Sequence, residues 1–258
     1  MDLSDDDPIA THPLLKMLFD SVAPTLQESL RSPSMEHFKW PKKLVYHREV
    51  FERTTDLTKI IDALIESENF MEAVPSPRFF RKFGISQNRW IEYHYTAWLI
   101  RFVSASDTAL VLTNSVFDIG LRERDCNLSV ITNQKYVQGC PVKAALKELE
   151  AVVSPFRTDR NLPAHKGRWP DPSRVSGSTN YKALAWIAST YTIDIMVKSK
   201  QNRSARSFVT SRFLQTAIQR EITHLLLSLR MPREELSAAI IKLLDSLLPV
   251  YQEKASSH

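Results

Sequence analysis

Apolar residues recur at helical spacing along most of this chain, and that spacing decides its fold class. Between Val142 and Phe156 the apolar side chains follow each other after four, three, four and three residues, which places them on one face of an α-helix. The C-terminal seam shows similar spacing at Leu236, Ile240, Leu243, Leu244, Leu247, Leu248 and Tyr251. Only 5 of the 258 residues are glycine, which argues against a sheet-rich fold with many tight turns. We therefore predict an all-α protein built as a helical bundle.

Prolines divide this pattern into separate predicted helices. We expect the centre of the bundle to comprise helices over about residues 87–120, 141–160, 180–198 and 205–230. A last helix should start at Pro232, because proline is favoured at the first helical position. The helix over 141–160 should be distorted at Pro155 and stop by Leu162, because the residue before a proline disfavours helical conformation. His165 would then lie in the connection that follows.

The chain is expected to divide into two regions. Residues 1–84 form an N-terminal helical region that is partly disordered at its start, and residues 85–258 form the bundle with its C-terminal helices. In the first region we expect a helix over residues 13–31, bent near Pro24, and a second helix capped by residues 54–56. The sequence assigns no purpose to this region.

Charge and cysteine content favour a cytoplasmic protein. The net charge of +5 suits a polyanionic partner. Cys126 and Cys140 are not in a metal-binding spacing, and they are expected to be reduced thiols. The segment Met1–Asp7 is acidic where a secretory signal is basic, and no apolar run is long enough to cross a membrane. We predict a protein with no membrane span, no metal and no cofactor.

The segment Arg160-Asn161-Leu162-Pro163-Ala164-His165 carries the residues best suited to chemistry. Arginine binds phosphate oxygens through a planar fork, and histidine moves protons near neutral pH. The segment lies in a basic cluster, formed by Arg157, Arg160, Lys166, Arg168 and Arg174. Together these residue types are what a metal-free phosphodiester cleavage site needs.

This segment resembles the signature of the HEPN superfamily, in which an arginine is followed by a polar residue, often asparagine, and after a few more positions by a histidine. Here Asn161 follows Arg160 directly, and four residues separate Arg160 from His165. The resemblance covers the motif and the helices on either side, over about residues 87–230. It implies an up-and-down helical core and a metal-independent endoribonuclease, with RNA as the partner.

In the chemistry that the resemblance implies, the ribose 2′-hydroxyl attacks the neighbouring phosphate and leaves a 2′,3′-cyclic phosphate. His165 would transfer the proton, Arg160 would stabilise the transition-state charge, and Asn161 would orient the histidine or a phosphate oxygen. One motif supplies one proton carrier, so a homodimer with two motifs facing one cleft would complete the site, as in many members of the superfamily. Many members are toxins or defence effectors, which would add an inhibitor protein to the partners.

Other residues could support this site. An additional acidic or polar group could come from the preceding long helix, at Glu92, Asp107 or Asn114, and the sequence does not choose between them. Flanking phosphates could be held by Arg157, Lys166 and Arg168, and a base could stack on Trp169. Pro163 is a departure that either fixes a productive loop or marks a variant that no longer cleaves.

The arginine–histidine spacing alone recurs elsewhere in the chain. Arg89 and His94 also enclose four residues, but they fall inside the long predicted helix and not on one face, so we interpret them as structural. Arg31 and His37 enclose five residues across a predicted helix end and lack a polar residue beside the arginine. The polar Asn161 and the basic cluster distinguish the motif from these two pairs.

Three alternatives to cleavage stay open from the sequence. Arg160 could cap the end of its helix, with Asn161 terminating the helix and His165 packing in the loop. A catalytically silent member of the superfamily could bind nucleotide or RNA in the same cleft. A helical interaction protein could use the C-terminal seam to bind a partner chain.

Overall fold

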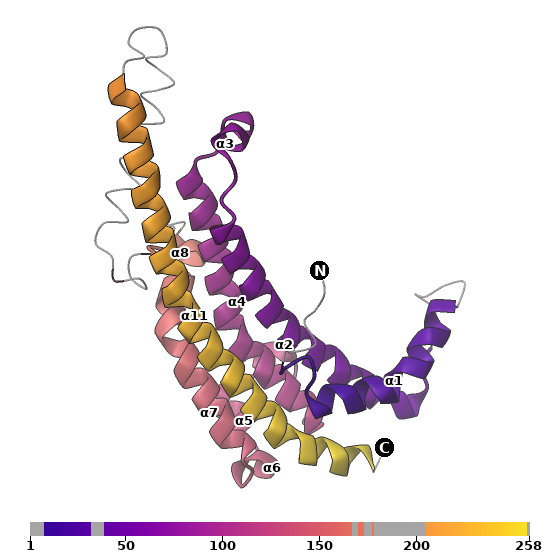
Figure 1. The fold of residues 1–258 in the computed structure, drawn as a ribbon. Coiled ribbons are helices and arrows are strands. Elements are labelled where there is room, and N and C mark those ends of the chain that lie inside the picture. The colour runs from indigo at the N-terminus through magenta and orange to yellow at the C-terminus, as the bar shows by residue number, and fades with distance from the viewer. Residues whose placement is uncertain (1–7, 32–38, 167–169, 173–176, 178–204, 257–258) are drawn as a thin grey trace. The chain divides into compact units, whose positions relative to one another are not determined.

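A computed structural model describes residues 8–31, 39–166, 170–172, 177 and 205–256. Within these ranges all regular secondary structure is helical, which confirms the predicted all-α class (Figure 1). The long helices are α1 (Pro13–Arg31), α2 (Lys42–Glu72), α4 (Gln87–Val116) and α11 (Ala205–Ala255). The shorter elements are α3 (Pro77–Phe83), η2 (Glu123–Asp125), α5 (Leu128–Thr132), α6 (Lys135–Gln138), α7 (Val142–Val153), η3 (Ser154–Phe156) and α8 (Arg157–Lys166), where η marks a 3-10 helix. The predicted helix over residues 180–198 lies outside the described residues.

The chain forms two compact units, and α2, α4 and α11 contribute residues to both. Unit 1 comprises residues 1–62, 103–155 and 234–258, and unit 2 comprises residues 63–102 and 156–233. The motif segment from Arg160 to His165 therefore belongs to unit 2.

The core of unit 1 confirms the apolar spacing of the sequence. The α7 stripe of Val142, Leu146, Leu149 and Val153 is at most 2% exposed. The buried part of the C-terminal seam consists of Leu236, Ile240, Leu243, Leu244, Leu247 and Tyr251. Because these side chains fill the core of unit 1, they are not available as a surface for a partner chain.

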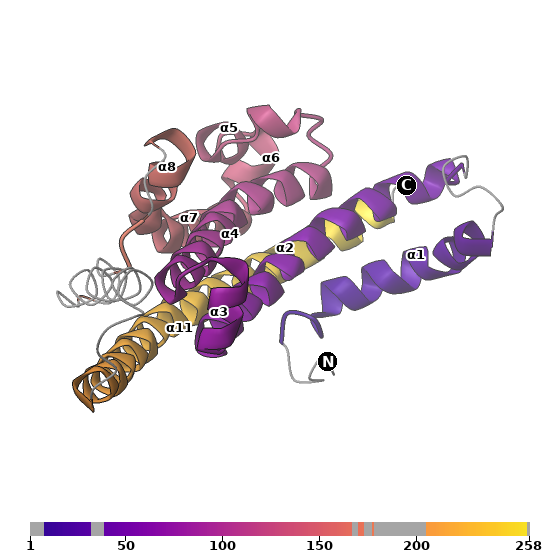
Figure 2. The same cartoon turned by 90° about the horizontal axis from the view of Figure 1, so that it is seen from above.

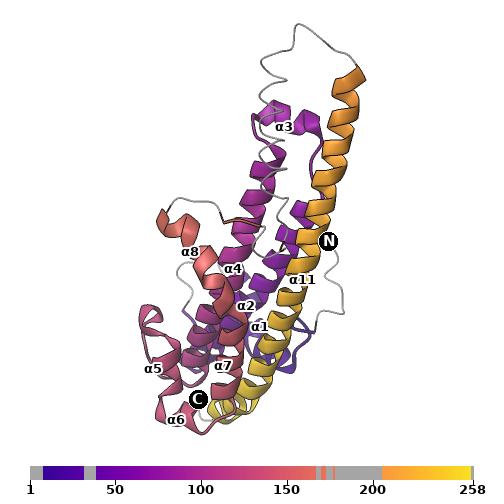
Figure 3. The same ribbon diagram turned by 90° about the vertical axis from the view of Figure 1, so that its left-hand side faces the viewer.

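Side-chain contacts hold α1 in unit 1. The rings of Phe19 and Phe51 lie 6.3 Å apart, where α1 runs alongside the first half of α2 (Figure 2). His12 Nε2 lies 3.1 Å from Asp245 Oδ1 on α11. In the same unit, α5 and α6 pack against each other and against α7 (Figure 3). An aromatic contact thus connects α1 to α2, and a polar contact connects His12, directly before α1, to α11.

A buried ion pair and an aromatic cluster hold unit 2 together. Glu68 is 5% exposed and accepts hydrogen bonds from Trp98 Nε1 at 3.1 Å and from Arg233 Nε at 3.0 Å. The Trp98 ring stacks on Phe102 at 4.6 Å, and Phe102 lies 4.7 Å from Phe156, directly before α8. Breaking a buried ion pair by removing one partner costs about 3–5 kcal/mol. These contacts fix the point from which α8 starts.

The two predicted helix boundaries at prolines are wrong. α8 continues through Pro163 to Lys166, so His165 lies within a helix and not in a connection. α11 also continues through Pro232, where the sequence predicted a new helix. A proline inside a helix costs about 3 kcal/mol, whereas burying one leucine contributes about 1.5–3 kcal/mol. Leu229 and Leu236, on either side of Pro232, are both 0% exposed, so their burial offsets the cost.

The predicted cap at residues 54–56 is also wrong, because α2 begins at Lys42. Thr54 lies inside the helix, where its Oγ1 donates a hydrogen bond to the carbonyl of Val50 at 2.7 Å. A threonine hydroxyl satisfied in this way is compatible with a helix interior. The distortion expected at Pro155 is confirmed, because η3 separates α7 from α8 there.

Candidate functional site

The motif residues lie on α8, which follows directly on η3. Arg160 is half-buried and Asn161 is exposed. For positions 162–166 the structure describes the helical backbone alone, so the side chains of His165 and Lys166 lie outside its described part. Arg168 and Trp169 lie outside the described residues. The geometry of the motif therefore follows from the backbone of α8 and from the side chains up to Asn161.

The helical register of α8 pairs Asn161 with His165. An α-helix turns by about 100° per residue, so positions four apart share a face and positions five apart lie about 140° apart around the axis. Asn161 and His165 are four apart, whereas Arg160 and His165 are five apart. The backbone of α8 thus places Asn161 and His165 on one face of the helix and Arg160 on a different face.

Asp159 is a residue of this helix that the sequence analysis did not single out. It is 8% exposed and lies in the first turn of α8, between Arg157 and Arg160. The helix dipole favours a carboxylate in this turn, and aspartate is rarely buried unless it is paired. The sequence signal that could have identified it is an acid between two arginines of the basic cluster, Arg157 and Arg160. Its burial suits a role in fixing the start of α8.

Glu92 on α4 has a local partner. Its side chain is 27% exposed, and its Oε2 lies 3.7 Å from Nη1 of Arg89. Burial raises the pKa of the Glu92 carboxyl above its ordinary value, and the nearby Arg89 guanidinium opposes that shift. Glu92 is thus a half-buried acid in unit 2, the unit that contains the motif.

The other two acidic or polar candidates of α4 belong to unit 1. The Asn114 side chain donates to the carbonyl of Leu121 and accepts from its backbone N–H, both at 3.0 Å. Its amide group is therefore used to hold the chain segment that follows α4. Asp107 lies on an exposed turn of α4 and lines a polar groove.

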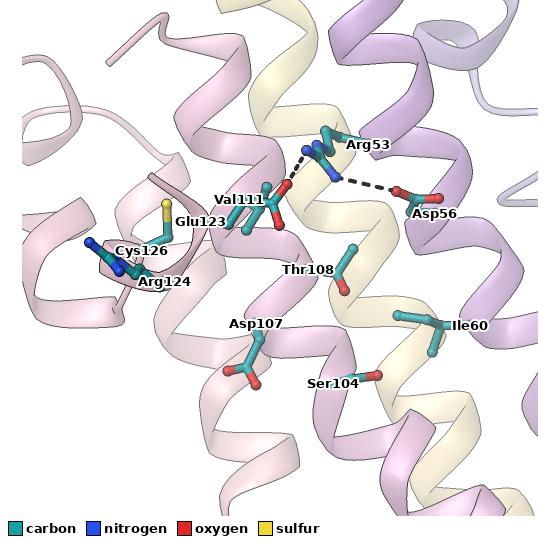
Figure 4. Close-up of a pocket in the computed structure, with 10 residues that line it drawn as sticks. All are labelled: Arg53, Asp56, Ile60, Ser104, Asp107, Thr108, Val111, Glu123, Arg124 and Cys126. Carbon is teal, nitrogen blue, oxygen red and sulfur yellow. Dashed lines mark hydrogen bonds and ion pairs between the residues drawn. The ribbon is translucent and has the colours of Figure 1, made fainter. Parts of the chain in front are cut away.

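The polar groove of unit 1 has a volume of about 590 Å³ between α2, α4 and η2 (Figure 4). Arg53 crosses it and forms ion pairs with Glu123 and, at 3.7 Å, with Asp56. Burial and the carboxylates of Asp125 and Glu123 raise the pKa of the Cys126 thiol, which makes it a poor nucleophile. Arg53 is thus paired with two carboxylates of this groove, and the raised pKa of Cys126 leaves its thiol unactivated.

The second arginine–histidine pair, Arg89 and His94, lies in an aromatic cluster of unit 2. The His94 ring is 9% exposed, stacks on Phe70 at 4.9 Å and meets the edge of Trp90 at 4.4 Å. Burial lowers the pKa of His94, and the Arg101 guanidinium lowers it further. Its Nε2 has no hydrogen-bond partner among the described residues. These contacts support the structural interpretation of His94.

The described residues contain no group of histidine, cysteine, aspartate and glutamate side chains that could hold a metal ion. Both cysteines, Cys126 and Cys140, are free thiols. None of the helices in the described ranges has an apolar stretch that could span a bilayer.

Comparison with known proteins identifies the family. Residues 40–243 match the family model of Cthe2314-like HEPN proteins, a range that extends beyond the predicted resemblance at both ends. No curated protein and no solved structure matches the chain. Since the match covers most of the chain and the fold is all-α, the protein belongs to the HEPN superfamily, in the Cthe2314-like HEPN family.

Proposed function

We propose that the protein is a metal-independent endoribonuclease that cleaves RNA by attack of the ribose 2′-hydroxyl on the adjacent phosphate. The observation that carries the proposal is the Arg160-Asn161…His165 motif on α8 of a chain that belongs to the HEPN superfamily. The products are a 2′,3′-cyclic phosphate and a 5′-hydroxyl.

Each motif residue has a distinct role in this reaction. His165 transfers the proton from the 2′-hydroxyl or to the leaving 5′-oxygen, because histidine is the side chain best suited to proton transfer near neutral pH. Arg160 donates paired hydrogen bonds to the phosphate oxygens as negative charge develops on them. Asn161 orients His165, which follows it by one helical turn.

A homodimer would allow Arg160 and His165 to act together although they lie on different faces of α8. Because Arg160 and His165 of one chain are five residues apart on a continuous helix, they share no face. A symmetric dimer with two motifs at one cleft would place Arg160 of one copy beside His165 of the other. It would also bring a second histidine to the cleft, so that one histidine could accept the 2′-hydroxyl proton while the other protonates the departing 5′-oxygen.

Further residues would position the RNA. Arg157, Lys166 and Arg168 would hold flanking phosphates, which agrees with their position in or directly after α8. Glu92 would assist proton transfer, since a carboxyl with a raised pKa holds a proton closer to neutral pH. Such an activity suits a cytoplasmic toxin or defence effector that an inhibitor protein keeps in check.

Cleavage of mixed RNA in excess EDTA tests the reaction. The wild type is compared with His165→Ala and with His224→Ala, a matched control at an exposed histidine of α11. Wild type and control should leave 2′,3′-cyclic phosphate ends, and His165→Ala should lose about 10²–10⁴-fold in rate. Equal cleavage by all three proteins, or products with 3′-hydroxyl ends, would overturn the proposal.

Mixing two inactive variants tests the dimeric site. If Arg160 and His165 act across the interface, a mixed dimer of Arg160→Ala and His165→Ala contains one intact site. The mixture should then recover activity that neither variant shows alone. Failure to recover activity when mixed dimers are known to form would place both residues in one chain.

The register of α8 also favours a second candidate function, in which the motif binds RNA or nucleotide without cleaving it. α8 is continuous through Pro163, so Arg160 and His165 of one chain lie on separate faces of the helix. In this case the wild type would bind labelled RNA in EDTA and leave it intact. Binding would still weaken on Arg160→Ala, because the phosphate contact is lost.

A further inference from the structure

The segment that joins α2 to α4 is strongly basic. Residues 73–91 contain no aspartate or glutamate, and their cations are Arg78, Arg81, Lys82 and Arg89. Arg89 interacts with Glu92 at 3.7 Å, at the start of α4. Arg78 and Lys82 lie on α3 and are exposed. A cationic surface of this kind attracts a polyanion.

The fold of this segment is well defined by its turn and its inner aromatic residues. α3 ends at Gly84, which adopts a left-handed conformation with φ of 65°, and its N–H bonds the carbonyl of Phe80. Phe80 is 8% exposed and packs against Trp90, whose Nε1 donates to the carbonyl of Phe70 at 2.9 Å. Ser86 Oγ then accepts from the N–H of Arg89 at 3.1 Å. The α3–α4 turn is thus held in place within unit 2 (Figure 1).

Three aromatic rings of the same region are about half exposed, although one face of the Phe70 ring lies against His94. Phe70 is 49% exposed, Phe83 57% and Tyr93 61%. The Lys82 ammonium lies 5.2 Å from the centre of the Phe83 ring, so cation and ring are presented side by side. Exposed aromatic residues grouped in this way mark an interaction site more often than isolated ones.

Rings interleaved with cations fit single-stranded RNA better than a membrane. Bases stack on exposed aromatic rings, and lysine and arginine contact the phosphates between them. A membrane-binding helix needs a long continuous apolar face. α3 has seven residues, and Phe80 of this helix is turned inward against Trp90.

We propose that Phe70, Arg78, Lys82, Phe83 and Tyr93 form an aromatic–basic surface that binds single-stranded RNA by stacking and phosphate contacts. This surface is separate in sequence from the α8 motif and goes beyond the proposed function. It binds RNA whether or not the motif cleaves it.

Fluorescence anisotropy with a labelled single-stranded 2′-O-methyl RNA tests the surface, because such an oligonucleotide cannot be cleaved by 2′-hydroxyl attack. The test variants are Phe83→Ala, Tyr93→Ala and Lys82→Glu. The matched control is Lys135→Glu/Tyr136→Ala, a cation and a 76% exposed ring on α6 of unit 1. All three test positions are exposed, so thermal unfolding should match the wild type.

Phe83→Ala and Tyr93→Ala should each raise the Kd for RNA at least about fivefold. Lys82→Glu should also raise the Kd, and its effect should be larger at low salt than at high salt. The control should bind as the wild type does. Unchanged Kd in all three test variants, or no binding by the wild type, would overturn the proposal. Binding of vesicles containing anionic lipid that Phe83→Ala abolishes, without oligonucleotide binding, would assign the surface to a membrane instead. Because the 2′-O-methyl RNA is not cleaved, this assay reports binding alone, so a failure of cleavage and a failure of this surface are separable.

Discussion

Two segments of unit 2 contain an arginine and a histidine at the same spacing, but the burial and the neighbours of these residues differ. On α4, His94 is a 9% exposed ring between Phe70 and Trp90, and Arg89 is paired with Glu92. On α8, Arg160 lies in a polar helix beside the exposed Asn161, within a basic cluster. Both pairs lie five residues apart on a continuous helix, so neither shares a face.

The difference between these pairs shows that the same spacing occurs in different surroundings, and we expect the surroundings to decide whether a histidine can do acid–base chemistry. Burial lowers the pKa of His94 and leaves only 9% of the residue exposed to a substrate. The α8 pair has what the α4 pair lacks, namely an asparagine one turn before the histidine and further cations for phosphate. The following predictions test this contrast, from the largest expected effect to the smallest.

The largest difference is expected between the two arginines. Arg160→Ala should reduce kcat for RNA cleavage by about 10²–10³-fold, as loss of a transition-state donor does elsewhere. Arg160→Lys should also be impaired, because lysine lacks the planar fork. Arg89→Ala should keep near-wild-type kcat at saturating RNA. Equal losses in Arg160→Ala and Arg89→Ala would remove the contrast between the two pairs.

Replacing His94 should affect stability instead of chemistry. His94→Ala removes ring contacts with Phe70 and Trp90 and should lower the free energy of unfolding by about 1–3 kcal/mol. Urea denaturation measures this change, and cleavage per folded molecule should be retained. A stable His94→Ala protein without cleavage activity would place His94 in the active site.

Acid should destabilise the protein through His94. Because the pKa of His94 is lowered in the folded state, the unfolded chain takes up its proton first as the pH falls. This contribution to stability is present above the unfolded pKa of about 6.5 and is lost as the pH decreases below it. His94→Phe keeps a ring in the aromatic cluster and should show a smaller loss of stability between about pH 7 and pH 5. The same loss in both proteins would assign the acid sensitivity to other groups.

The smallest effect is expected for stability on removal of the Arg89–Glu92 ion pair. The pair has an N–O distance of 3.7 Å and an arginine side chain that is 54% exposed. Arg89→Ala should therefore change the free energy of unfolding by less than about 1 kcal/mol. A larger loss in denaturant would show that Arg89 has a structural role beyond this pair.

The helix cores were predictable from sequence, but the helix ends at prolines were not. The apolar stripe from Val142 to Val153 and the buried part of the C-terminal seam follow the predicted spacing, because the order of apolar residues alone determines which face of a helix is buried. The continuation of α11 through Pro232 depends on the burial of residues on both sides of the proline. The local backbone preference of proline gives no information about that burial.

For the site, the sequence predicted the motif but not that all its residues lie on one continuous helix. The preference of Leu162 for a non-helical backbone placed His165 in a connection, whereas α8 keeps it one turn after Asn161. The burial of Asp159 and the lowered pKa of His94 also depend on tertiary contacts, so spacing and composition did not predict them.

The most direct test makes the same substitution at both histidines. RNA cleavage in excess EDTA is measured for wild type, His94→Phe and His165→Phe, each at equal folded concentration. We predict that His94→Phe cleaves at close to the wild-type rate and that His165→Phe loses at least about 100-fold. Retained cleavage in His165→Phe, or its loss in His94→Phe alone, would contradict the assignment of the chemistry to α8.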